Sequence, residues 1–265
     1  VQLEPTDISV FSRVPGGVIR SGLSAAYSVV VTDNEIYWLD DKRRFVRFSG
    51  RQVERISSQY EKEIQQLISV SDCYGFQIEF EGNSFLVFQF TAAVKTYVYN
   101  IKEQSWSRWG NWDSTSADYT RWPGNTYCYS GLWGSHLLGD TSSGAISKIS
   151  SQVSVNGSSL IRCLKRTGLV DHKTRKKKRS YKIRFKTKRG QGLSDRTPVL
   201  MIRWKDDNQA WVNWKEVSLG DGGDNKSVKE LSTKGIYRTR QWEFVCSDNV
   251  SLSLYDLEED VELLR

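Results

Sequence analysis

One stretch of alternating apolar and aromatic residues, 85–109, constrains the fold more than any other part of the chain. Between residues 85 and 90 both alternating sets of side chains are largely apolar, which predicts a strand buried on both faces or packed between sheets. A half-buried strand is expected at 95–100, followed by a polar reversal and a return that carries Trp106 and Trp109. This order of elements is typical of one blade of an antiparallel β-propeller.

Composition supports an all-β chain with a sizeable core. Its 265 residues include 10 Trp, 12 Tyr and 20 Gly, a balance that suits short strands and tight turns. No apolar run approaches the roughly 18 residues of a membrane span, and no signal peptide opens the sequence. Because the first residue is Val1, we expect an N-terminal portion to be missing.

Blade-like meanders recur on both sides of this stretch. Strands are predicted at 28–31, 35–39 and 45–48, and again at 125–133, 135–139 and 145–149. Between them, Ser58 and Glu61 have capping-box spacing, so a helix is expected at 59–70. The meanders recur at roughly 40–45 residues, the spacing of propeller blades, although a β-sandwich with long loops remains open. We assign residues 1–158 to propeller blades.

The character of the chain changes from residue 159, where we place a second antiparallel β unit, residues 159–265. Residues 162–190 contain fourteen Lys or Arg and one acid, Asp171, for a local charge of about +13, so the rest of this +7 chain sums to about −6. A strand with one buried and one cationic face is predicted at 181–186, and a mobile loop at 173–179. Further strands are expected at 199–204, 211–217, 227–231, 237–245 and 250–255, before an acidic tail, 256–262.

Two interpretations of the basic block stay open. It is either a solvated face that keeps the protein soluble or a contact surface for a polyanion or an acidic partner. The candidate contact residues are Lys173, Arg175, Lys176, Lys177, Lys178, Arg179, Lys182, Arg184, Lys186, Lys188 and Arg189.

Catalysis, metals and cofactors find little support in the sequence. The four Cys are far apart and the chain has only two His, His136 and His172, so metal-site spacing is absent. We expect buried free thiols in a protein folded in a reducing cytosol. A glycine turn is predicted at 219–224 in preference to a calcium site. The prediction is therefore a protein that is not an enzyme, with no cofactor.

Short motifs along the chain occur in an order that resembles one family, the packaged-DNA-stabilisation proteins of short-tailed bacteriophages, also called tail accessory or tail-nozzle proteins. The first half carries Glu4-Pro5-Thr6-Asp7, Pro15-Gly16-Gly17, Glu54-Arg55-Ile56-Ser57 with Glu61, Phe80-Glu81-Gly82-Asn83-Ser84-Phe85 and Lys95-Thr96-Tyr97-Val98-Tyr99-Asn100 with Trp106. The second half carries Leu138-Gly139-Asp140 with Gly144, Ile161-Arg162 with Arg166-Thr167, the box 204–211, and Leu219-Gly220, Gly223, Gly235, Arg238 and Arg240. Asn83 replaces a family His, and Asn100 stands in a family Asp position. The box 204–211 resembles a Ser-x-Asp-Gly-Gly-x-x-Trp motif, called an Asp box, but lacks its glycines.

The resemblance implies a structural protein of the virion, assembled in the host bacterial cytoplasm. It implies a hexameric ring of β-propellers below the portal and adaptor that seals the DNA exit channel and contacts the tail needle or spikes. The basic block then faces either packaged DNA or, as we favour, an acidic protein neighbour. The alternative is a receptor- or carbohydrate-binding propeller whose sugar platforms are Trp109, Trp112, Trp122 and Trp133. A sialidase-like propeller enzyme is a third class, suggested by the degraded Asp box.

Overall fold

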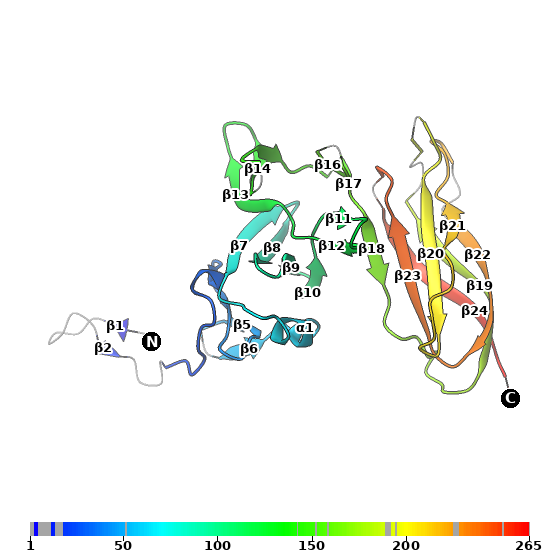
Figure 1. Ribbon diagram of the computed structural model, residues 1–265, viewed down its shortest axis with the longest axis horizontal. Coiled ribbons are helices and arrows are strands. Elements are labelled where there is room, and N and C mark those ends of the chain that lie inside the picture. The colour runs from blue at the N-terminus through cyan, green and yellow to red at the C-terminus, as the bar shows by residue number, and fades with distance from the viewer. Residues whose placement is uncertain are drawn as a thin grey trace. The chain divides into compact units, whose positions relative to one another are not determined.

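The computed structural model describes residues 3–4, 12–13, 18–50, 52–141, 143–151, 153–157, 159–188, 192–193, 195–224, 228–250 and 252–264 (Figure 1). This part of the chain is all-β, with antiparallel sheets and one short α-helix. It forms two compact units, Val1–Ile149 and Ser150–Arg265, which are described separately. None of the helices in these ranges is long and apolar enough to cross a membrane. The predicted turn at 15–17, the motif residues 5–7 and Arg189 lie outside the described residues.

Unit 1 contains a first four-stranded meander in which neighbours along the chain are neighbours in the sheet. Its strands are β3 (Val30–Val31), β4 (Ile36–Leu39), β5 (Phe45–Phe48) and β6 (Val53–Arg55). The predicted strand at 28–31 is wrong in its first half, because a 3-10 turn, η1 (Ala26–Ser28), precedes β3. Strand β6 was not predicted.

The second meander contains the alternating apolar and aromatic stretch 85–109. Its strands are β7 (Cys73–Phe80), β8 (Asn83–Phe90), β9 (Lys95–Asn100) and β10 (Ser105–Arg108), again in chain order. The expectation that β9 is half-buried is wrong, because Thr96 to Asn100 are all buried. The strand is paired with β8 and β10 along its two edges, and core side chains cover both of its faces.

Strand β8 is buried on both faces, as its double apolar alternation predicts. On one face Leu86, Phe88 and Phe90 pack in a core with Tyr37 and Phe45 of the first meander. The ring centroids of Phe45 and Phe88 are 4.2 Å apart. The sheet β7–β10 therefore contacts the β3–β6 sheet through one continuous aromatic core.

The opposite face of the same sheet packs on a third meander. Ile78, Val87 and Val98 form a buried cluster on this face. Trp122, and Tyr127 and Leu138 of the third meander, pack against this cluster. The third meander consists of β13 (Gly124–Ser130), β14 (Ser135–Asp140) and β15 (Ile146–Lys148). A separate short pair, β11 (Trp112–Asp113) with β12 (Asp118–Tyr119), precedes it in the chain. The β7–β10 sheet thus lies between two neighbouring meanders.

The helix α1 (Glu61–Gln65) is shorter than the predicted 59–70. Tyr60 is its N-cap and makes no side-chain capping bond, so the predicted capping box of Ser58 and Glu61 is wrong. The Glu61 carboxylate is instead 3.5 Å from the guanidinium of Arg55. Because Tyr60 is the N-cap, Ser58 and Glu61 do not occupy the N-cap and N3 positions that a capping box requires.

Unit 2 consists mainly of two sheets that share one core (Figure 1). The first has the order β18 (Cys163–Arg166), β23 (Arg240–Cys246), β20 (Val199–Asp206), β21 (Lys215–Ser218), and the second the order β22 (Val228–Tyr237), β19 (Lys178–Thr187), β24 (Leu254–Leu263). Ile183 and Phe185 of β19 pack against Ile202, Trp242 and Phe244 of the first sheet. A short hairpin, β16 (Val155–Asn156) with β17 (Ser159–Leu160), precedes both sheets.

Four strand or tail predictions for unit 2 are wrong. The strand expected at 237–245 is interrupted, because Tyr237 ends β22 and Arg240 begins β23. The strand expected at 250–255 begins only at Leu254, the first residue of β24. The acidic residues 256–262 are not a tail but most of strand β24, which pairs along the whole length of β19. The return strand expected at 211–217 is shortened to β21, because Trp211 and Trp214 stack on the guanidinium of Arg203 instead of joining the ladder.

The turn after β20 shows how the glycine-poor box 204–211 reverses the chain. Asp207 and Asn208 adopt the left-handed backbone, with φ of 47° and 62°, and the Gln209 amide donates to the Asp206 carbonyl at 2.8 Å. The Asp207 carboxylate accepts hydrogen bonds from the amides of Arg238 and Thr239. Asp and Asn tolerate this conformation better than other non-glycine residues, so they supply the turn in place of glycine.

Candidate functional site

The basic strand β19 is positioned by its alternation. Ile183 and Phe185 are buried in the core, whereas Lys182, Arg184 and Lys186 project from the other face. This confirms the prediction of one buried and one cationic face. Tyr181 departs from the pattern because the pairing register shifts between Ser180 and Lys182, which leaves Tyr181 exposed.

Acidic residues on both flanking strands neutralise the cationic face. On the β22 side, Glu230 accepts from Lys182 Nζ at 3.2 Å and from Arg184 Nε at 3.0 Å. On the β24 side, the ion pairs are Lys186 with Asp256 at 3.2 Å, Arg184 with Glu258 at 3.7 Å, and Arg179 with Glu262 at 3.7 Å. Four of the candidate contact residues therefore pair with acids of this same chain.

These ion pairs are partly exposed, and each contributes little to stability by itself. Hydrogen bonds from Lys182 and then from Arg184 lower the pKa of Glu230. Opposite charges on neighbouring strands also favour one pairing register over others. These ion pairs, here called the ion-pair ladder, thus align β24 on β19. Its basic members, here called the ladder cations, are Arg179, Lys182, Arg184 and Lys186.

Lys178 is not a contact residue, and the prediction that it lies in a mobile loop is wrong. It begins β19 and is fully buried. Its Nζ donates to the carbonyls of Thr174 at 2.8 Å, Lys176 at 3.0 Å and Arg238 at 2.7 Å. An ammonium group has three protons, and here each has a carbonyl acceptor, which is how the buried charge is accommodated.

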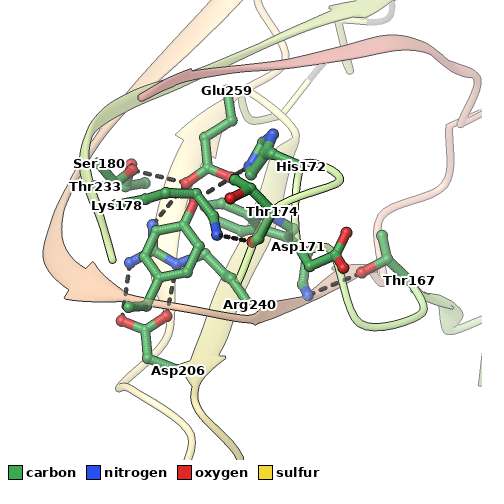
Figure 2. A network of polar contacts seen from close by, with 12 residues as sticks. Thr167, Asp171, His172, Thr174, Lys178, Ser180, Asp206, Thr233, Arg240 and Glu259 are labelled. Carbon is green, nitrogen blue, oxygen red and sulfur yellow. Dashed lines mark hydrogen bonds and ion pairs between the residues drawn. The ribbon is translucent and has the colours of Figure 1, made fainter. Parts of the chain in front are cut away.

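Arg240 is the centre of a buried polar network in unit 2 (Figure 2). Its guanidinium is fully buried and forms two hydrogen bonds with Asp206, at 2.6 and 2.8 Å, and one with Glu259 of β24, at 2.9 Å. It also lies 4.0 Å from the ring centroid of Tyr237. Burial and the Glu259 carboxylate raise the pKa of Tyr237.

Glu259 contacts further members of this network. Its carboxylate accepts from the Ser180 hydroxyl at 2.8 Å and lies 3.3 Å from His172 Nε2, which is also 3.2 Å from the Tyr237 hydroxyl. The network therefore ties β24 to β19, β20 and β23. Because each buried charge faces an opposite charge or hydrogen-bond donors, this arrangement fits a structural role.

The segment that leads into β19 holds four cations with no acidic partner among the described residues: Lys173, Arg175, Lys176 and Lys177, here called the loop cations. All four are exposed. His172 and Lys173 have positive φ, and the Thr174 amide donates to the Asp171 carbonyl at 3.1 Å, so the segment starts with a tight turn. Lys188, also exposed, follows the other end of β19.

The four tryptophans of the carbohydrate-binding alternative are not a common platform. Trp109 and Trp122 pack edge to face, 5.1 Å apart, against the core of unit 1, so they are wrong as exposed sugar platforms. Trp112 is half-buried and packs edge to face on Tyr119. Trp133 is 66% exposed, at the turn between β13 and β14.

A second ionic cluster in unit 2 was not anticipated. Glu243 is fully buried between two arginines, with Oε1 2.8 Å from Arg203 Nε and Oε2 2.7 Å from Arg166 Nε. Trp211 and Trp214 stack on Arg203, at 4.9 and 4.3 Å from ring centroid to guanidinium. Alternation along one strand gives no signal for this cluster, because its members come from β18, β20 and β23 and the segment before β21.

The histidines and cysteines complete the inventory of reactive groups. His136 Nδ1 is 2.8 Å from the Tyr127 hydroxyl, and its ring packs among aromatic side chains. Cys73 and Cys246 are buried free thiols as predicted, but Cys128 and Cys163 are exposed, which corrects that prediction for half of the cysteines. Within the described ranges no group of three or more His, Cys, Asp or Glu could hold a metal ion.

Comparison with known proteins identifies no family. No family model matches the chain, and no curated protein matches it either. Among solved structures it is similar to the exo-beta-1,3-galactanase of Phanerochaete chrysosporium with galactose, at 8% identity and a TM-score of 0.23, over 85% of this chain and 65% of that one. A second structure of that enzyme, a substituted form with beta-1,3-galactotriose, gives 9% identity and a TM-score of 0.20, over 86% and 64%. The chain thus spans slightly less than two thirds of these structures.

Proposed function

We propose that this protein is a structural component of a short-tailed bacteriophage tail, in which unit 1 forms part of a β-propeller. The observation that carries the proposal is the β7–β10 sheet, which is covered on one face by the β3–β6 meander and on the other by β13–β15. Successive meanders that pack face to face in chain order have the arrangement of propeller blades. The ordered motifs of the sequence add the tail-nozzle assignment.

A hydrogen bond across one of these contacts supports the same arrangement. Gln89 is buried in β8, and its Nε2 donates to the carbonyls of Gly124 at 2.6 Å and Trp122 at 3.1 Å. This side chain fixes the third meander against the second, in addition to the apolar packing between them. Such a cross-link suits a stiff module that carries load between other proteins.

In this proposal the chain forms a hexameric ring with portal and adaptor proteins on one side and the tail needle or spikes on the other. The loop cations and Lys188 are the exposed part of the basic block available to a partner, because Lys182, Arg184 and Lys186 already have acidic neighbours. We assign them to an acidic protein surface and, secondarily, to non-specific contact with packaged DNA. Contacts of this kind weaken as salt rises.

Native mass spectrometry and electron microscopy of the purified protein, alone and mixed with portal–adaptor complexes of short-tailed phages, test the proposal. A six-membered ring, or a ring formed on the portal–adaptor complex, is the expected result. A protein that stays monomeric alone and in every mixture contradicts it. A variant in which all loop cations are Gln should bind the complex more weakly, and the matched control K182Q/R184Q/K186Q should bind it as the wild type does.

Carbohydrate binding is the second candidate, and the exposure of Trp133 favours it. Trp133 lies in the β13–β14 turn, and Tyr129 of β13 is 58% exposed. A glycan array with the wild type and W133A separates the two functions. Wild-type binding that W133A loses supports a lectin, whereas the absence of any glycan signal from the wild type contradicts carbohydrate binding.

A further inference from the structure

Two cysteines of unit 2 lie directly opposite each other on neighbouring strands. Cys163 begins β18 and Cys246 ends β23, and the antiparallel register pairs them. Directly opposite residues in an antiparallel pair have Cα atoms about 4.5 or 5.5 Å apart and side chains on the same face. A disulfide needs a Cα separation of about 4.4–6.8 Å. The register therefore places the two Cα atoms within the range of a disulfide and both side chains on one face of the sheet.

The two thiols differ in access, which gives them different roles in an exchange reaction. Cys163 is exposed and lies on an edge strand of its sheet, whereas Cys246 is 2% exposed. Although Cys163 is exposed as a residue, the protein around its thiol partly desolvates the sulfur and raises its pKa. Burial also raises the pKa of Cys246, and the charge of Asp248 and then Cys163 add to that rise. Because the thiolate is the reactive form, both react slowly at neutral pH and faster in mildly alkaline solution.

We infer that Cys163 and Cys246 form a redox-active pair that a small disulfide, such as oxidised glutathione, converts to a cross-strand disulfide. The Cys163 thiolate attacks one sulfur of the reagent, forming a mixed disulfide and releasing one reduced glutathione. The Cys246 thiolate then attacks the Cys163 sulfur and releases the second. The protein dithiol loses two electrons and two protons, and the reagent takes up both to become two thiols.

The bond joins the first strand of the β18–β23–β20–β21 sheet to the strand at its centre. It closes the segment from residue 163 to residue 246, which contains most of unit 2. A cross-link around a long segment restricts the unfolded chain strongly. Oxidation therefore raises the melting temperature of unit 2.

The other two cysteines are built-in controls. Cys128 is also exposed, but the residue opposite it is Leu137, so it has no thiol with which to resolve a mixed disulfide. Cys73 is fully buried and opposite Phe90. Under the same treatment Cys128 should stop at the mixed disulfide and Cys73 should stay unmodified.

The experiment treats the folded full chain with oxidised glutathione in mildly alkaline buffer and maps its peptides without reduction. The expected product links the peptides of Cys163 and Cys246, raises the melting temperature, and reverts with dithiothreitol. In C246S, Cys163 should accumulate as the mixed disulfide, and in C163A, Cys246 should stay a free thiol. C163A changes an exposed position, so its fold should be intact. A wild type in which Cys163 accumulates as the mixed disulfide, or stays free while Cys128 is modified, overturns the inference.

Discussion

Replacement of Arg240 by Met tests the buried network of unit 2. R240M keeps the length and most of the volume of the side chain but removes its charge. Glu259, whose side chain is 5% exposed, then loses its cationic neighbour, and Asp206, at 22%, retains some water. Breaking a buried ion pair by removal of one partner costs about 3–5 kcal/mol. We therefore expect unit 2 to lose about that much free energy of unfolding.

The protein's own buried thiols report this loss for each unit separately. Cys246 is buried in unit 2 and Cys73 in unit 1, so thiol labelling of the reduced full chain across a urea series, read by mass spectrometry, follows both. With an m-value of about 2 kcal/mol/M, the Cys246 midpoint should fall by about 2 M in R240M while the Cys73 midpoint stays. The control R179M removes a half-exposed pair and should cost less than about 1 kcal/mol. A loss below about 1 kcal/mol in R240M would refute the reasoning.

Three further predictions concern single features of the fold. The pKa of Glu230 is lower in the folded protein, so the ionised carboxylate stabilises the fold above the unfolded pKa of about 4.3, and this stabilisation is lost as pH falls through the lower folded pKa. The difference in free energy of unfolding between the wild type and E230Q should therefore shrink over that pH range. A difference that stays constant contradicts this. Q89L leaves two carbonyls of unit 1 without their hydrogen-bond donor and should lower the urea midpoint of Cys73 labelling by the equivalent of about 1–3 kcal/mol. Q77L, on the neighbouring strand β7, is the matched control. Equal Cys73 midpoints in Q89L and Q77L contradict the cross-link. Replacement of the loop cations by Gln should weaken heparin binding at low salt without a change in melting temperature, whereas unchanged binding removes them as a polyanion contact.

Local alternation predicted the strands whose burial depends on their own side chains. The strand predicted at 45–48 is found at the same residues as β5, and the double apolar pattern of 85–90 correctly placed β8 between layers. In β19 the alternation of Ile183 and Phe185 with basic residues separated its two faces. These predictions succeed because a strand's period of two is visible within a few residues.

The failures concern residues whose state depends on distant partners. Lys178 looked like one more member of a charge run, but it is buried because carbonyls 4, 2 and 60 residues away accept its protons. The residues 256–262 looked like a solvated tail because their own composition is strongly acidic. They form a strand because β19, far earlier in the chain, supplies the cations and the backbone ladder.

The candidate site was therefore only partly predictable. Its location on β19 and its outward cations followed from the sequence. The division into four cations paired with acids, one buried lysine, and the exposed loop cations and Lys188 did not. That division depends on where Glu230, Asp256, Glu258 and Glu262 fall in the register of β22 and β24. Register is set by turns and tertiary packing, which a one-dimensional pattern does not contain.

Hydrogen–deuterium exchange of the native full chain tests most directly the claim that the basic strand is occupied by the chain's own acidic strand. Backbone amides of β24 should exchange slowly, at rates close to those of β19, while the amides of residues 175–177 exchange fast. The E259A variant should speed exchange in β24 more than E258A, which removes an exposed carboxylate from the same strand. If residues 254–263 exchange as fast as an unfolded peptide, β24 is a free tail, and the neutralised basic strand described here does not exist.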